Sequence, residues 1–361
     1  LASGSDENSF YGLEAGYSCT TGESSVFLGA KCGRGTTDSG FSVAIGADCY
    51  RFGNISGTVA LGYKAAGGTS FAGSNNTALG YQTLLGCTSG SNNTAVGREA
   101  LEANENGHSN TAVGYLALTA NTSAQQNTAV GEGALKTTTT GGYNSAFGYD
   151  ALAALTTGEQ NTAIGRYSLV ACTTGSRNST LGNFAGFALT TGGYNTFVGE
   201  AAGQTSTTGA NNTAVGSDAF RYGAGAENTC LGRQAGDVGS FVGSNNIIIG
   251  YQADPSAANA SNEITLGNSS ITKFRIPGIN FVVKDNGGTP SDGQVLTADG
   301  NGEASWEAAG SPAVADGCIY ENSQTISNNY TMTTNKNGMS AGPITVSATV
   351  TIPSGSSWSI V

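Results

Sequence analysis

The chain repeats one five-residue line almost unchanged, as in Asn93-Thr94-Ala95-Val96-Gly97, Asn110-Thr111-Ala112-Val113-Gly114, Asn127-Thr128-Ala129-Val130-Gly131 and Asn161-Thr162-Ala163-Ile164-Gly165. The closing glycine recurs every 17 residues from Gly80 to Gly216. The same phase extends outward to Gly12 and Gly267, with one 16-residue and one 18-residue interval on either side. A fixed period of this length is typical of a solenoid. We therefore predict a repeat array over residues 1–271.

The composition agrees with a solenoid and argues against an ordinary enzyme. Of 361 residues, 56 are Gly, only 11% are charged and one is His, whereas about 25% charged residues are usual. Because such a chain cannot build a thick core, stacked coils must supply the burial. The net charge of −11 argues against nucleic acid as a partner and against anionic membranes. No run of about 18 apolar residues is present, so no membrane insertion is expected.

Two apolar positions precede each repeat glycine, which we number zero. Position −1 is large and apolar in all sixteen repeats, and position −2 is mostly Ala. Successive residues of a strand point to opposite faces, so only one of these rows can fill its own coil. The other row must be covered, and a second copy of the chain is the simplest cover. Because Ala allows backbones to approach closely, we expect the Ala row, including Ala112, to face the neighbouring chain.

A second pair of apolar residues follows the glycine at positions +3 and +4. Examples are Ala100-Leu101 and Ala117-Leu118, and they predict a second short strand in each coil. Links such as Thr156-Thr157-Gly158 have the composition of turns. The fold class is therefore all-β: a parallel β-solenoid of about sixteen 17-residue coils.

Asparagine recurs at position −4, where stacked side-chain amides can form a hydrogen-bonded ladder. Asn also tolerates the left-handed backbone of a corner. Glycosylation at triplets such as Asn92-Asn93-Thr94 is the alternative, and we favour the structural role. The predicted structural ladder consists of Asn76, Asn93, Asn110, Asn127, Asn144, Asn161, Asn178, Asn195 and Asn212.

These repeats resemble those of phage and bacterial fibre proteins related to the left-handed β-roll heads of trimeric autotransporter adhesins. The segment 263–271, Glu-Ile-Thr-Leu-Gly-Asn-Ser-Ser-Ile, resembles the end of such arrays in phage tail fibres. Segments 293–306 and 341–361 are similar to modules of phage fibres. The resemblance implies a homotrimer and a structural role in a virion, as a tail fibre or appendage that presents a rigid rod and a terminal domain for host attachment. A bacterial extracellular filament or adhesin head is the alternative.

The period stops after residue 271. Short strands and turns over residues 272–310 predict a β neck or linker, and residues 311–361 predict a small all-β cap domain, which an open solenoid end needs. Since the chain begins Leu1-Ala2-Ser3, we expect an upstream attachment region. The expected location is extracellular, on a virion surface or, alternatively, on a bacterial cell surface.

Catalytic, cofactor and metal sites are not expected. The seven Cys form no Cys-x-x-Cys or Cys/His cluster, and most occupy small-residue positions of the repeat. A Cys32–Cys49 bridge in adjacent coils is left open. His108 falls in a predicted turn, so we interpret it as a solvated residue. Cleavage of polysaccharide by paired carboxylates, as in a tail spike, is an alternative function, but the acidic residues are scattered across the repeat.

Position +1 is variable and contains several Tyr and Arg residues, so we predict that it faces outward and forms cation–π neighbours. Stabilisation between coils is the favoured role, and contact with host glycans is the alternative. An ice- or surface-binding array is also considered for the Thr row at position −3, but this row shares a face with the apolar −1 row. Candidate glycan contacts are Tyr115 and Tyr149 in the array and, in the favoured terminal domain, Tyr320, Tyr330 and Trp358.

Overall fold

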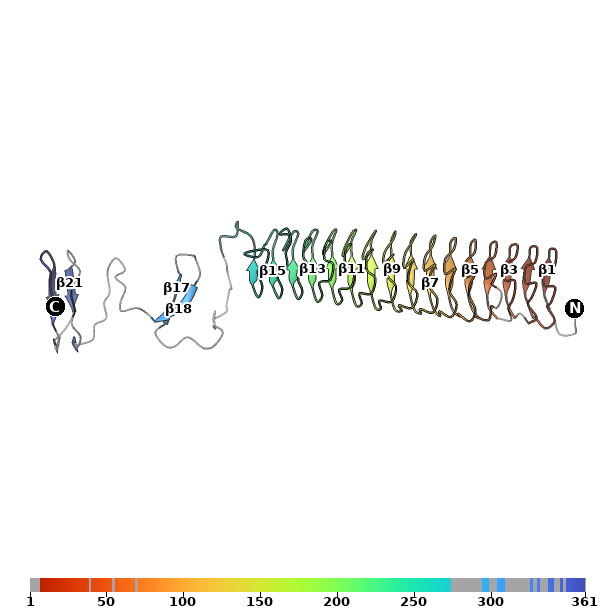
Figure 1. Ribbon diagram of the computed structural model, residues 1–361, viewed down its shortest axis with the longest axis horizontal. Coiled ribbons are helices and arrows are strands. Elements are labelled where there is room, and N and C mark those ends of the chain that lie inside the picture. The colour runs from red at the N-terminus through yellow and green to blue at the C-terminus, as the bar shows by residue number, and fades with distance from the viewer. Residues whose placement is uncertain are drawn as a thin grey trace. The chain divides into compact units, whose positions relative to one another are not determined.

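A computed structural model describes residues 7–38, 40–53, 56–68 and 71–273, and, further along the chain, residues 294–298, 304–308, 325–326, 330–331, 337–340, 345–346 and 349–360. The chain divides into two units, Leu1–Phe274 and Arg275–Val361, which are described separately. Every regular element of the described residues is a β-strand (Figure 1). The all-β prediction is confirmed for this part of the chain.

The first unit contains sixteen strands of three residues each. They are β1 (Ser9–Tyr11), β2 (Val26–Leu28), β3 (Val43–Ile45), β4 (Val59–Leu61), β5 (Thr77–Leu79), β6 (Thr94–Val96), β7 (Thr111–Val113), β8 (Thr128–Val130), β9 (Ser145–Phe147), β10 (Thr162–Ile164), β11 (Ser179–Leu181), β12 (Thr196–Val198), β13 (Thr213–Val215), β14 (Thr229–Leu231), β15 (Ile247–Ile249) and β16 (Ile264–Leu266).

These strands form one sheet in which each strand pairs only with its neighbours in chain order. All of the pairs are parallel and in the same repeat phase, as Thr94 with Thr111 and Val96 with Val113 show. The coils therefore stack one on the next, about 17 residues apart (Figure 1). The predicted parallel β-solenoid is confirmed.

The interior of each coil is filled by position −2 rather than position −1. Ala95, Ala112 and Ala129 are fully buried inside their own coils. Val96 and Val113, the next residues of their strands, point to the opposite, outward face and are partly exposed. The prediction that Ala112 faces a neighbouring chain is wrong. The reason is the small space inside a 17-residue coil, which admits a methyl group from the strand because larger side chains enter from the opposite wall.

That opposite wall is built by turns, so the predicted second strand at positions +3 and +4 is also wrong. Leu101 and Leu118 have positive φ, 53° and 51°, which is a left-handed conformation and cannot continue a strand. Both side chains are fully buried. The turns still bond from coil to coil, since the Leu101 N–H donates to the Ala117 carbonyl at 3.0 Å. Burial of the leucine compensates for the cost of the left-handed backbone.

The repeat glycine marks the closest approach of adjacent coils. At Gly114, where φ is +138°, an added Cβ would lie 2.4 Å from the carbonyl oxygen of Gly131. No side chain fits in that space, and a positive φ of this size is itself unfavourable for other residues. The invariance of this glycine along the array therefore follows from coil-to-coil packing.

The second unit contains one antiparallel and three parallel strand pairs among its described residues. The antiparallel pair joins β17 (Gln294–Ala298) and β18 (Ala304–Ala308). The parallel pairs join β19 (Thr325–Ile326) with β22 (Thr345–Val346), β20 (Tyr330–Thr331) with β23 (Val350–Thr351), and β21 (Asn337–Ser340) with β24 (Ser357–Ile360).

Each parallel pair in this second unit joins residues 20 apart, as Thr325 with Thr345 and Asn337 with Ser357 show. This second period was not predicted from the sequence, although Thr325-Ile326-Ser327 and Thr345-Val346-Ser347 are its visible signal. The neck over residues 272–310 and the cap over residues 311–361 remain predictions, because most of both segments lies outside the described residues.

Candidate functional surfaces

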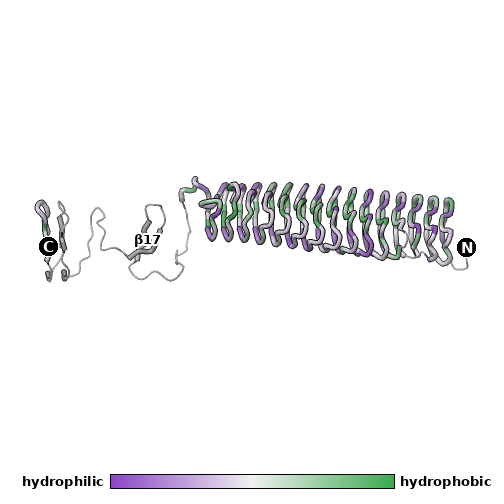
Figure 2. Tube along the Cα trace, in the orientation of Figure 1, coloured by the Kyte–Doolittle hydropathy of each residue, from purple (hydrophilic) through white to green (hydrophobic). Residues whose placement is uncertain are grey.

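The outward face of the long sheet carries positions −3 and −1. Apolar residues recur at the same place in successive coils (Figure 2). In β10 to β16 the −1 side chains of Ile164, Leu181, Leu231, Ile249 and Leu266 are exposed by 37% to 49%. Threonines such as Thr94, whose side chains are partly exposed, stand beside them at position −3. The face is thus a long, regular strip of aliphatic and threonine side chains.

The asparagines of position −4 lie at a buried corner of the coil, and all nine residues of the predicted ladder are buried. The Asn110 Oδ1 accepts a hydrogen bond from the Asn127 backbone N–H at 3.0 Å. The Asn127 Nδ2 donates to the Gly141 carbonyl at 3.0 Å. In several coils the amides also bond directly, as Asn110 Nδ2 does to Asn93 Oδ1 at 3.2 Å. These contacts tie each corner to the coils before and after it.

The +1 row contains aromatic and arginine side chains that contact one another from coil to coil. The rings of Tyr63 and Tyr81 stack with their centroids 5.5 Å apart. The Arg98 guanidinium lies 5.5 Å from the ring centroids of both Tyr81 and Tyr115. It also pairs with the Glu99 carboxylate at 2.8 Å, which raises the pKa of Arg98. The charge of Arg98 is therefore already neutralised by its neighbour.

A second aromatic cluster surrounds Arg166, and most of its members were not predicted from the sequence. Tyr149, at position +1, is joined by Tyr167 and Phe184 at position +2 and by Phe187 at position +5. The Tyr167 ring centroid lies 5.3 Å from that of Tyr149 and 5.5 Å from that of Phe184. The signal was the placement of aromatic residues at position +2, where neighbouring coils have Leu116, Gly133 and Asp150.

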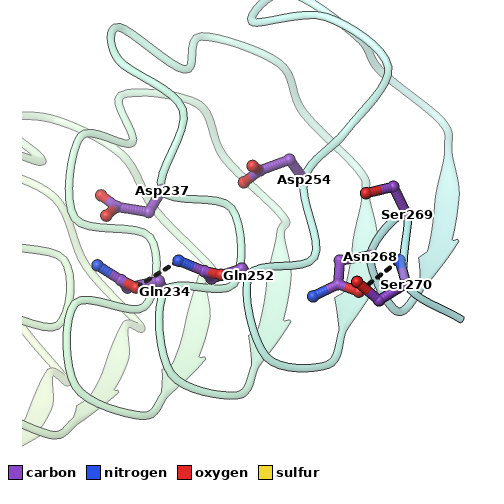
Figure 3. A pocket seen from close by; sticks show the side chains of 7 residues that line it. All are labelled: Gln234, Asp237, Gln252, Asp254, Asn268, Ser269 and Ser270. Carbon is purple, nitrogen blue, oxygen red and sulfur yellow. Dashed lines mark hydrogen bonds between the residues drawn. The ribbon is translucent and has the colours of Figure 1, made fainter.

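A cavity of about 380 Å³ lies near the end of the array (Figure 3). Seven polar residues line it: Gln234, Asp237, Gln252, Asp254, Asn268, Ser269 and Ser270. Gln252 donates to Gln234 at 3.1 Å, and the Asn268 Oδ1 accepts from the Ser270 N–H at 3.0 Å. Asp237 and Asp254 come from successive coils, and their carboxylates point in the same direction (Figure 3).

Asp237 is the most perturbed acid of this cavity. Burial, and then the charge of Asp218, raise the pKa of Asp237 from 3.8 to about 6. Its Oδ1 has no hydrogen-bond partner among the described residues. The hypothesis of polysaccharide cleavage, which needs two carboxylates of different pKa at one site, remains a prediction.

The described residues contain no group of three or more His, Cys, Asp or Glu side chains arranged to hold a metal ion. A search of the same residues for a helix long and apolar enough to cross a membrane finds none. His108 lies in an exposed turn, where its Nδ1 accepts the Ser91 N–H at 3.0 Å. Cys32 and Cys49 are both free thiols, and each donates to a backbone carbonyl, of Ala44 and Ala60 respectively, at 3.2 Å.

Of the three candidate glycan contacts in the terminal domain, the structure describes two. Tyr320 lies outside the described residues. Tyr330 is in β20, opposite Val350, and Trp358 is in β24, opposite Gly338, where its side chain is partly buried. The strand pairing thus puts Tyr330 and Trp358 on different strand pairs.

Comparison of the chain with protein-family models, with curated proteins and with solved structures finds no match. The residues and the geometry of the solenoid are therefore the basis for a proposed function.

Proposed function

We propose that the chain forms the rod of a homotrimeric extracellular fibre, such as a virion tail fibre, which carries a terminal region to a host surface. The observation that supports this proposal is the exposed strip at positions −3 and −1. A monomeric soluble protein rarely exposes a contiguous apolar strip of this kind. Sixteen strands spaced by about 4.8 Å make the strip roughly 70–75 Å long. A second and a third copy of the same chain would match its length and its period.

The strip is compatible with two locations of the fibre. A trimeric rod suits a virion fibre and equally suits a filament or adhesin on a bacterial surface. The resemblance of the segment 263–271 to the end of tail-fibre arrays favours the virion. Electron microscopy of the native particle distinguishes the two locations.

The test of the proposal is the mass of the full chain in native buffer. The wild type should be a trimer, and Val113→Asp together with Val130→Asp should weaken its assembly more than tenfold, because each carboxylate would be buried without a partner. Tyr143→Ser, at an exposed position outside the strip, is the control and should leave the trimer intact.

A monomeric wild type would overturn the proposal. In that case the exposed threonine rows of the same face, with Thr94, Thr111 and Thr128 in successive coils, would make the ice- or surface-binding alternative the better one. Measurement of thermal hysteresis would then decide.

A further inference from the structure

Three arginines occupy position +1 of the repeat, and two of them, Arg98 and Arg166, differ in what their guanidinium groups contact. Both Arg98 and Arg166 are at position +1, both are exposed, and both lie against tyrosine rings. Arg98 is paired with Glu99 at 2.8 Å. In the described part of the chain the Arg166 guanidinium has no ion pair and no hydrogen bond, and it lies against the rings of Tyr149, Tyr167 and Phe184. Its N–H donors are therefore available to a ligand.

The surroundings of Arg166 are aromatic on several sides. Its guanidinium carbon lies 4.5 Å from the ring centroid of Tyr167, 5.8 Å from that of Phe184 and 5.9 Å from that of Tyr149. Phe187 packs edge-on against Phe184, with centroids 5.5 Å apart. Tyr149 is exposed by 42% and Phe187 by 36%. Contacts among the rings hold the guanidinium plane in place, which reduces the entropy lost when it binds a planar anion.

We infer that this cluster, Tyr149, Arg166, Tyr167, Phe184 and Phe187, binds a saccharide that carries a carboxylate. The guanidinium can take a carboxylate in a two-point hydrogen bond, and the exposed ring surfaces can cover the apolar C–H side of a sugar ring. The inference rests on the proposed function for its biological role, since it supplies the class of surface glycan to which the fibre would attach.

The net charge of the chain further restricts the class of ligand. A net charge of −11 repels densely charged polyanions at long range. At the cluster itself, Asp150 and Glu132 are near enough to Tyr149 to raise the pKa of its phenol. With one arginine in the cluster and two acidic residues near Tyr149, the site favours a glycan with isolated carboxylates over a sulfated or phosphorylated polymer.

The experiment measures binding of a hyaluronan hexasaccharide, which carries one carboxylate in each disaccharide, to the full chain by calorimetry. The same hexasaccharide with its carboxyl groups reduced to alcohols is the matched ligand, and it should bind at least tenfold more weakly. Arg166→Gln should lower the affinity for the carboxylated form at least tenfold, and Tyr167→Ala about fivefold. Arg98→Gln is the matched protein control and should change the affinity less than twofold.

Three results would overturn the inference. The first is equal binding of the two hexasaccharides, and the second is equal loss in Arg166→Gln and Arg98→Gln. The third is loss of the trimer in Arg166→Gln, which would show that the cluster is covered by another copy of the chain. An acidic peptide that binds the wild type while the hexasaccharide does not would reassign the site to a protein partner. None of these results affects the mass of the wild type, so the proposed function is tested separately.

Discussion

Residues at positions −2 and +4 share one space inside each coil. Six successive coils combine Ala at −2 with Leu at +4, as in Ala129 and Leu135. Where −2 is Phe, as in Phe197, +4 is Gly203, and a Cβ on that glycine would lie 2.6 Å from the ring. The same exchange occurs at Phe10 with Gly16 and at Phe27 with Gly33. A phenyl ring entering from the strand thus replaces a leucine entering from the turn.

This exchange predicts a strong coupling between Ala129 and Leu135. Ala129→Phe alone should destabilise the protein by about 1–3 kcal/mol through overpacking, and Leu135→Gly alone by about 2–5 kcal/mol through a cavity. The double variant should be more stable than the sum of the two changes by at least about 2 kcal/mol, because the ring fills the cavity. Urea unfolding of the four proteins measures the coupling. Additive effects would show that the two side chains do not use the same space.

At the scale of the element, the turn between β14 and β15 contains an acid that opposes folding at neutral pH. The pKa of Asp237 is about 6 in the folded protein and 3.8 for the free group. The folded state therefore binds the proton more tightly than the unfolded state. The stabilisation due to this proton is complete below about pH 4 and is lost as the pH rises through 6.

Asp237→Asn should accordingly raise the melting temperature at pH 7.5 and leave it unchanged near pH 4, where Asp237 is already neutral. We expect a rise of about 1–3 °C. Glu159→Gln, which removes an exposed carboxylate, is the control and should not reproduce this pH dependence. Scanning calorimetry at the two pH values makes the comparison, and an equal rise at both would contradict it.

At the scale of the whole molecule, the solenoid is a row of similar coils whose strands pair only with their neighbours. The free energy of unfolding of such a row is close to the sum of the stabilities of the single coils and of the interfaces between adjacent coils. The length of the rod can therefore change by whole coils without changing its architecture, whereas a fractional coil breaks the phase.

Deletion of residues 115–131, one whole coil, should leave a folded rod that is one strand shorter. It joins Gly114 to Glu132 and keeps every later residue in phase. We expect a melting temperature within about 5 °C of the wild type. Deletion of residues 115–123 shifts the strand residues out of phase and should prevent cooperative unfolding. Circular dichroism with thermal melting tests both, and equal behaviour of the two deletions would contradict the coil-by-coil description.

The sequence by itself determined the parallel sheet, its register and the asparagine corner. Each of these features follows from a short local pattern that recurs at a fixed period. It could not decide which face of the strand points inward. Both faces of each strand carry apolar residues, so the sequence pattern does not distinguish the inward face from the outward one. Which face points inward depends on the side chains that fill the coil from the opposite wall. The side chains of Leu101 and Leu118 reach the interior from turns with a left-handed backbone. Leucine rarely adopts this conformation, so its presence in a sequence does not predict such a turn.

The Arg166 cluster depended on tertiary structure for a related reason. Its members come from positions +1, +2 and +5 of three successive coils, and no single row of the repeat contains them all. Arg98 and Arg166 are equivalent in the repeat, and only the geometry shows that one guanidinium is paired with Glu99 while the other lies against aromatic rings. The period determines which residues stack on one another. Side-chain packing between rows decides which arginine has no ion pair and can therefore bind a ligand.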